Sequence, residues 1–153
     1  MRTTAPYGSW KSPITTGLIV SGSIGLGQVA LDGEDIYWVE MRPSEGGRMV
    51  LVKHDPEGEI VDVTPEPYSV RTRVHEYGGG AFLVHEEVVY FSNYSDQRIY
   101  RQENGGEPQA ITPDVEMRYA DGCFDPARNR IICVREDHTG EGEPVNCIVA
   151  VDA

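Results

Sequence analysis

Segment 71–80, RTRVHEYGGG, is the most informative stretch of this sequence for binding chemistry, because two arginines, a histidine and a glutamate precede three glycines. Guanidinium groups bind carboxylates and other hydrogen-bond acceptors, so the two arginines point to recognition of peptide carbonyls or carboxylates. In an extended backbone alternate residues share a side, which predicts Arg71, Arg73 and His75 on one side and Glu76 on the other. These four residues are the candidate substrate-binding residues of the chain.

Two interpretations of this segment stay open. In the structural one, Arg73 and Glu76 form an ion pair between neighbouring sheets and Tyr77 covers a hydrophobic core. In the functional one, Arg71 and Arg73 line a central tunnel and meet the substrate. The three glycines at 78–80 suit both, because they allow one backbone to approach another closely.

Other motif fragments lack the partners that their chemistry requires. The glycines at 22, 25 and 27 read GxxGxG instead of the nucleotide-binding GxGxxG. His75 and Glu76 begin like the zinc motif HExxH, but position 79 is glycine. The nucleophile motif GxSxG of serine hydrolases occurs nowhere in the sequence. We therefore expect no catalytic residue, no metal site and no cofactor in this chain.

Charge and cysteine content narrow the choice of partners. The chain has 153 residues and a net charge of −12, which argues against nucleic acid or an anionic membrane as a partner. Residues 14–31 carry no charge, but glycines interrupt them, so an extended arm is expected there and not a membrane span. The three cysteines have no CxxC spacing, which predicts buried free thiols and a cytoplasmic location.

The elements that must position the candidate residues are short β-strands separated by turns. Runs such as IYWV (36–39), MVLV (49–52), VVYF (88–91) and IICV (131–134) are rich in β-branched and aromatic residues, and Gly, Pro, Asn and Asp lie between them. The strands recur in groups, and two Thr-Pro endings, Thr64-Pro65 and Thr112-Pro113, lie 48 residues apart. Four strands in about 40–50 residues are typical of a β-propeller blade.

The predicted fold is therefore an all-β partial propeller of roughly three four-stranded antiparallel blades. We divide it into an extended N-terminal arm (1–27), blade 1 (28–65), a linker strand with blade 2 (66–113) and a partial blade 3 (114–153). A closed propeller needs at least about four blades, so the chain is expected to be a fragment of a longer protein. Its open blade faces would favour self-association.

Three parts of the sequence resemble the N-terminal propeller region of prolyl oligopeptidase family serine peptidases, of the acylaminoacyl-peptidase and dipeptidyl-aminopeptidase type. They are APYGSWKSPIT (5–15), DIYWVE with RP and GGR (35–48), and RVHEYGGG (73–80). The resemblance implies a propeller that covers a C-terminal α/β-hydrolase domain holding a Ser-Asp-His triad. It also implies that the propeller admits oligopeptides, excludes folded proteins and contacts the hydrolase domain through the arm.

The resulting hypothesis is an N-terminal propeller fragment that gates or positions substrate for a peptidase of oligopeptides or acyl-peptides. The partners would be the hydrolase domain of the same protein and the peptide substrate. A non-catalytic binding or scaffold propeller is the alternative, and a propeller glycosidase with carboxylates around its tunnel is a second rival.

Overall fold

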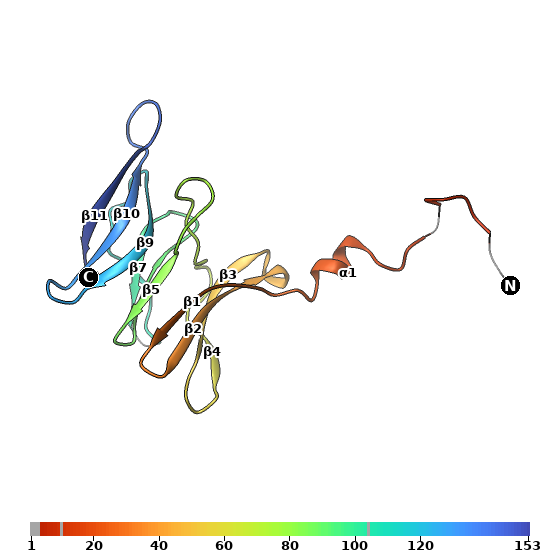
Figure 1. The fold of residues 1–153 in the computed structure, drawn as a ribbon, viewed down its shortest axis with the longest axis horizontal. Helices are drawn as coiled ribbons and strands as arrows, with labels where there is room; N and C mark the ends of the chain where they lie inside the picture. Colours follow the sequence, from red (N-terminus) through yellow and green to blue (C-terminus); the bar gives the residue numbers. More distant parts are fainter. Residues whose placement is uncertain (1–3, 10, 104) are drawn as a thin grey trace.

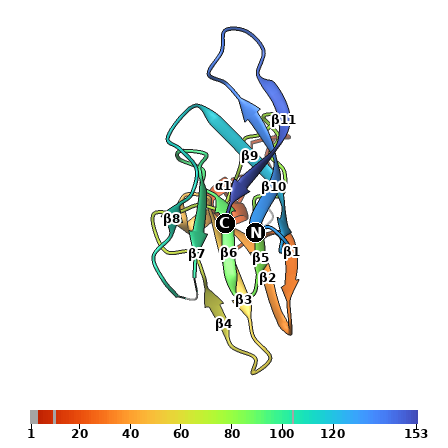
Figure 2. The same ribbon diagram turned by 90° about the vertical axis from the view of Figure 1, so that its left-hand side faces the viewer.

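Three antiparallel β-sheets lie side by side in the computed structural model, which describes residues 4–9, 11–103 and 105–153 (Figure 1). The sheets follow one another in chain order, and the first strand of the middle sheet packs beside the first strands of both neighbours. Figure 2 views the molecule from the side of the third sheet, with the other two sheets behind it. Twisted sheets placed in sequence around their first strands form a partial β-propeller, which confirms the predicted fold class.

The first sheet has the order β1-β2-β3-β4. A short 3₁₀ turn, Pro43–Glu45, joins its second and third strands. A β-bulge between Leu26 and Val29 shifts the pairing of the first strand with the second. The strands are β1 (Gly25–Asp32), β2 (Asp35–Arg42), β3 (Arg48–His54) and β4 (Ile60–Asp62).

The second and third sheets have the orders β5-β6-β7-β8 and β11-β10-β9. Strands of the second sheet are β5 (Phe82–His85), β6 (Val88–Ser92), β7 (Ile99–Gln102) and β8 (Gln109–Ala110). Strands of the third sheet are β9 (Met117–Asp125), β10 (Arg130–Asp137) and β11 (Val145–Asp152). In the described residues the third sheet has three strands, whereas each of the other two sheets has four.

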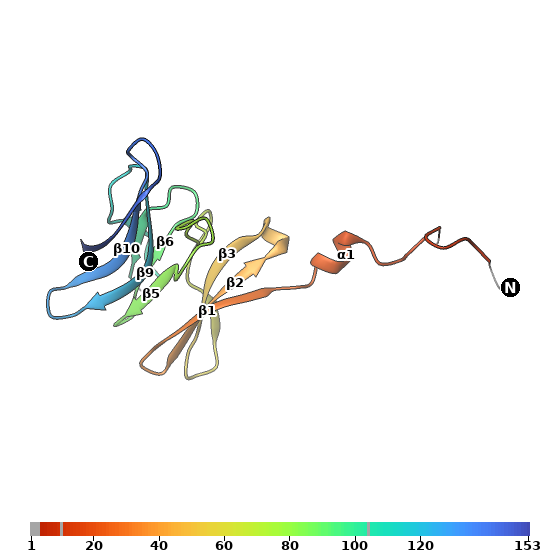
Figure 3. The ribbon, with the colours of Figure 1, turned by 45° about the horizontal axis from the view of Figure 1, so that its top comes forward.

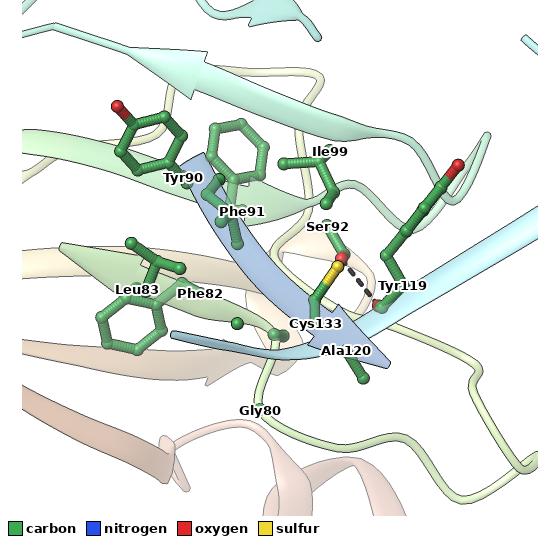
Figure 4. Close-up of a pocket in the computed structure, with 13 residues that line it drawn as sticks. Gly80, Phe82, Leu83, Tyr90, Phe91, Ser92, Ile99, Tyr119, Ala120 and Cys133 are labelled. Carbon is green, nitrogen blue, oxygen red and sulfur yellow. Dashed lines mark hydrogen bonds between the residues drawn. The ribbon is translucent and has the colours of Figure 1, made fainter. Parts of the chain in front are cut away.

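Two hydrophobic cores fill the spaces between neighbouring sheets. The core between the first and second sheets is built on Tyr37, Val39, Leu51, Val70, Phe82, Val89 and Phe91. The core between the second and third sheets is built on Tyr90, Ile99, Tyr119, Ile131 and Cys133. Figure 4 shows the centre of the second core, a cavity of only about 20 Å³, where the Ser92 hydroxyl donates to the Tyr119 carbonyl at 2.9 Å. Most of the interface is closely packed.

The repeated Thr-Pro endings play one structural role in two sheets. The Thr64 hydroxyl accepts a hydrogen bond from the backbone N–H of Leu51, and the Thr112 hydroxyl accepts one from Ile99, both at 3.0 Å. Both threonines are buried. Each hydroxyl therefore continues the hydrogen bonding of a third strand where the fourth strand has ended.

Polar side chains also join the first strands of the first two sheets. The Gln28 amide on β1 donates to the Phe82 carbonyl at 2.7 Å and accepts from the Ala81 N–H at 2.8 Å. The Asp32 carboxylate accepts from both backbone N–H groups of the β5–β6 turn, at 3.2 and 2.6 Å. These bonds fix the alignment of β1 with β5 at both ends of the strands.

The residues that precede β1 differ from the expected extended arm. They include one short helix, α1 (Thr16–Val20), and β1 begins at Gly25, before the expected start at Gln28. The helix forms because the Thr15 hydroxyl accepts a hydrogen bond from the Leu18 N–H at 3.1 Å and so caps its first turn. Figures 1 and 3 show this part of the chain leading away from the sheets. In the described part of the chain, no helix combines the length and apolar character that a membrane span requires.

The cysteines are free, but only one of them is buried. Cys133 lies in the second core, Cys147 is half-buried and Cys123 is exposed. The expectation of three buried thiols is wrong for Cys123, because its position on β9 is opposite Ile132 and its side chain lies outside the core.

Candidate functional site

The segment before β5 is irregular from Arg71 to Arg73 and forms no strand there apart from a single bridge between Val70 and Asn93. Val70, Thr72 and Val74 are buried, whereas Arg71 and Arg73 are exposed. The predicted alternation is present here, and the buried residues anchor a backbone whose arginines lie on the surface. The expected linker strand is absent because this backbone makes only isolated hydrogen bonds, to Ser92 of β6 and to the Gln97 side chain, and no continuous strand ladder.

The backbone around the two arginines is held by the second sheet. The Arg71 N–H donates to the Ser92 carbonyl at 3.0 Å, and the Arg73 N–H donates to the Gln97 side-chain oxygen at 2.7 Å. Gln97 is itself buried, with a left-handed backbone of φ 59°. The backbone from which each arginine side chain extends is therefore fixed, while the side chain itself is exposed.

Both guanidinium groups lie over the ring of Tyr94. The Arg71 group is 5.0 Å and the Arg73 group 5.5 Å from the ring centroid, distances at which a cation is attracted to an aromatic face. Tyr94 is 39% exposed, so the arrangement lies at the surface. We refer to Arg71 and Arg73, with Tyr94 beneath them, as the arginine pair on Tyr94, or the arginine pair for the two arginines alone.

The chain turns sharply after Val74, which changes the expected placement of the next two residues. His75 and Glu76 have left-handed φ values of 54° and 62°, so the strand alternation ends before them. Both side chains are exposed on the same turn, and the prediction that Glu76 lies opposite His75 in a strand is wrong. The physical reason is that the turn folds back, with the Gly78 N–H donating to the Val74 carbonyl at 2.9 Å.

A buried carboxylate from the third sheet meets this turn. Glu136 on β10 is 4% exposed and accepts a hydrogen bond from the His75 backbone N–H at 3.1 Å. The His75 ring nitrogen Nδ1 lies 3.4 Å from the same carboxylate oxygen, and the His138 ring nitrogen Nε2 lies 2.7 Å from the other carboxylate oxygen. Arg118 on β9 approaches that same oxygen at 3.4 Å. We refer to Glu136, His75, His138, Arg118 and Glu76 as the Glu136 cluster.

Arg118 connects the cluster to the arginine pair. It donates to the Arg73 carbonyl at 2.8 Å and forms an ion pair with Glu76 at 2.6 Å. Glu76 therefore pairs with Arg118 and not with Arg73, so the prediction of an ion pair between Arg73 and Glu76 is wrong. The expected cover by Tyr77 is also wrong, since that side chain is 97% exposed.

The surroundings stabilise the charged forms of both glutamates. Burial would raise the pKa of Glu136, but hydrogen bonds from His138 and the His75 N–H, together with nearby positive charge, hold it below its ordinary value of 4.5. The hydrogen bond and charge of Arg118 lower the pKa of Glu76. Both glutamates are therefore ionised at neutral pH.

The glycines after the turn allow the segment to pass close to β9. A Cβ atom added to Gly79 would lie 2.9 Å from the Asp121 carboxylate, and one added to Gly80 would lie 3.0 Å from it. The same carboxylate accepts the Gly80 N–H at 2.7 Å. The close backbone approach expected of these glycines is present. It occurs between the third sheet and residues 70–81, the segment before β5, which we call the connector.

An open hollow of about 410 Å³ adjoins both groups. Arg73, Arg118 and His138 contribute its basic lining, and Asp96, Asp114 and Glu116 contribute carboxylates. The remaining lining residues are Ser95, Gln97, Val115 and Met117. Within residues 4–9, 11–103 and 105–153, no group of three or more His, Cys, Asp or Glu side chains is arranged to hold a metal ion.

Sequence reasoning found Arg71, Arg73, His75 and Glu76 but missed the residues that complete their surroundings. Glu136 lies 61 positions from His75, and Tyr94 belongs to a turn between β6 and β7. The one available signal was the alternation of Glu136 and His138 at the end of a predicted strand, which places both side chains on one face.

Comparison with known proteins finds solved structures and nothing else: no family model and no curated protein matches the sequence. A puromycin hydrolase superimposes over 99% of this chain with a TM-score of 0.85 and 34% identity. A puromycin-hydrolyzing peptidase of Mycobacterium tuberculosis superimposes over 99% with a TM-score of 0.82 and 36% identity. A second puromycin hydrolase structure, the S511A mutant complexed with PGG, matches over 97% at 34% identity.

The match is almost complete for this chain and partial for the others. This chain spans about 25% of the length of each of these structures. The shared fold and the identity above 30% agree with the motifs of the arm, β2 and the segment before β5. The chain therefore matches the N-terminal β-propeller region of peptidases of the prolyl oligopeptidase family.

Proposed function

We propose that this chain is the propeller part of a serine-type peptidase that hydrolyses short peptides or acyl-peptides, and that it admits and positions their substrates. The observation that carries the proposal is the 34–36% identity to a puromycin hydrolase and a puromycin-hydrolyzing peptidase across nearly all of this chain. Puromycin carries an aminoacyl group, so a related enzyme would act on small aminoacyl or peptidyl compounds.

The catalytic residues would lie outside this chain. Its sequence has no GxSxG motif, so the serine nucleophile and its partners would belong to a C-terminal α/β-hydrolase domain of the same protein. Exposed apolar side chains on β1 and β11, among them Leu26, Val29 and Ile148, support a covered state in the longer protein. Arg71, Arg73, His75 and Glu76 would then face substrate between the propeller and the hydrolase domain.

The test compares the longer protein that carries this chain with the 153-residue chain alone. The longer protein should be labelled by a fluorophosphonate probe and should hydrolyse puromycin and aminoacyl arylamides, whereas the short chain should do neither. Labelling abolished by replacing the serine of a downstream GxSxG would support the proposal. A longer protein that is neither labelled nor active would instead support the scaffold alternative.

Two further expectations belong to the same proposal. The free thiols favour a reducing compartment, so the protein would be cytoplasmic, and fractionation of the native cells tests that location. In the short chain, a second copy would cover the exposed apolar faces, because core-like surface associates in water. Sedimentation that shows only a monomer at high concentration would refute the self-association.

A further inference from the structure

The arginine pair differs from the other arginines of this acidic protein. In the described ranges, seven arginines form ion pairs with carboxylates, at positions 42, 48, 101, 118, 128, 130 and 135. Arg98 donates to the Thr112 carbonyl at 2.8 Å. Within the same ranges the guanidinium groups of Arg71 and Arg73 form no ion pair, although the protein carries 25 acidic residues.

The two positive charges are held together by the structure and not by a shared carboxylate. Both lie over one Tyr94 ring, and the backbone of each arginine is fixed by a hydrogen bond to the second sheet. Arg118 holds the Arg73 carbonyl from the third sheet. Two adjacent like charges on a fixed backbone repel each other, and a bound anion removes that repulsion.

The hollow beside the pair defines the rest of the ligand. Its volume of about 410 Å³ is within the usual range of small-ligand sites. Three carboxylates, of Asp96, Asp114 and Glu116, line it together with Arg73. A dianion such as phosphate would therefore meet repulsion there, while a molecule with one negative end and a positive or neutral body would not. A short peptide has that charge distribution.

We propose that Arg71 and Arg73, stacked on Tyr94, bind the free C-terminal carboxylate of a short peptide whose body lies in the adjoining hollow. Guanidinium groups can hold a carboxylate through paired N–H···O bonds, which lysine or water cannot reproduce. The proposal rests on the proposed function and adds to it the end of the substrate that this site recognises.

The experiment is an NMR titration of the ¹⁵N-labelled 153-residue chain, which tolerates millimolar affinities. The probes are trialanine, trialanine amide and inorganic phosphate, and the reporters are the backbone N–H groups of Arg73, Tyr94 and Gln97. Because a hydrogen-bonded charge contributes roughly 1.5–3 kcal/mol, trialanine should bind at least about tenfold more tightly than its amide. Phosphate should bind more weakly than trialanine.

Variants assign the preference to the two arginines. Arg71→Ala and Arg73→Ala should each weaken trialanine binding about tenfold and leave binding of the amide unchanged. The double variant with Arg71→Lys and Arg73→Lys keeps both positive charges at exposed positions. It should stay folded, as a dispersed NMR spectrum would show, and should bind trialanine with an affinity between those of the unmodified protein and the alanine variants. The matched control is Arg128→Ala, an exposed arginine of the β9–β10 turn, which should bind trialanine like the unmodified protein.

Equal affinity for trialanine and its amide would overturn the proposal, and so would a preference that survives both alanine variants. Displacement of trialanine by an equal concentration of phosphate would show a general anion site and would overturn the peptide assignment. Fluorophosphonate labelling of the longer protein does not depend on this site. Failure of the titration with labelling intact would therefore refute this inference and leave the peptidase proposal standing.

Discussion

Replacement of Glu136 tests whether the Glu136 cluster fixes the connector to the third sheet. In Glu136→Ala the His75 N–H and the His138 ring lose their acceptor in a buried place, while Arg118 keeps its ion pair with the exposed Glu76. Removing one partner of a buried ion pair usually costs about 3–5 kcal/mol. Because Arg118 retains one partner, the lower end applies, and we expect a loss of about 3 kcal/mol in the free energy of unfolding.

Glu136→Gln separates the charge of the side chain from its shape. The amide keeps an oxygen for the His75 N–H but loses the negative charge, so a loss of about 1–2 kcal/mol is expected at pH 7. The pKa of Glu136 is below its ordinary value of 4.5 in the folded protein, so its charge stabilises the fold above about that pH. The stabilisation is lost as pH falls through the lowered pKa. The difference between the unmodified protein and Glu136→Gln should therefore shrink toward acid pH.

Urea unfolding followed by circular dichroism, from pH 7 down to pH 3, measures both effects. At pH 7 the loss for Glu136→Ala corresponds to a decrease of roughly 6–12 °C in melting temperature. Glu107→Gln, at an exposed position, is the matched control and should unfold like the original at every pH. If Glu136→Gln has the same free energy of unfolding as the unmodified protein at pH 7, the charge of Glu136 does not hold the connector in place.

Three further changes test the packing and the repeat. Thr112→Val removes the acceptor of the buried Ile99 N–H and should lower the free energy of unfolding in urea by about 1–3 kcal/mol. Thr112→Ser keeps the hydroxyl and should cost less. Equal losses for the two variants would contradict the role of the hydroxyl. Gly122→Ala would place a Cβ 2.5 Å from the Leu83 side chain and should lower the free energy of unfolding by roughly 1–3 kcal/mol. Gly140→Ala is the control and should have no effect, because a Cβ there has no neighbour within 4 Å. Burial raises the pKa of Cys133 to about 11. Iodoacetamide at pH 8 should therefore modify the exposed Cys123 and leave Cys133 intact until urea unfolds the protein. Rapid modification of Cys133 in the native protein would show that the second core opens.

The blades could be predicted from the sequence because their determinants are local. Strand residues alternate or cluster within a few positions, and turns are marked by Gly, Asp and Asn. The 48-residue spacing of Thr64 and Thr112 has a physical basis, since each hydroxyl extends the hydrogen bonding of the strand before it. The helix α1 could not be inferred with the same ease, because one capping threonine decides between an extended and a helical turn in an uncharged segment.

The candidate site could be predicted only in part because its contacts are distant in sequence. The shared side of Arg71 and Arg73 followed from the alternation of residues, and both side chains lie over the Tyr94 ring. The partner of Glu76 could not follow, because Arg118 and Arg73 are equivalent cations until the third sheet is placed. The turn at His75 and Glu76 was equally hidden, since a positive φ is uncommon for any residue other than glycine, even for histidine, which adopts it more often than most.

The connector's position makes the candidate site a shared product of two blades. Gln97 of the second sheet holds the Arg73 N–H, and Arg118 of the third sheet holds its carbonyl, so one peptide segment is fixed from both sides. A movement of the third sheet relative to the second must then displace the Arg73 backbone or break one of these bonds. The arginine pair therefore depends on the angle between the blades, although its own residues precede both sheets in the chain. If the proposed carboxylate site is correct, a substitution inside the second core should for this reason weaken trialanine binding in the NMR titration as well as lower stability.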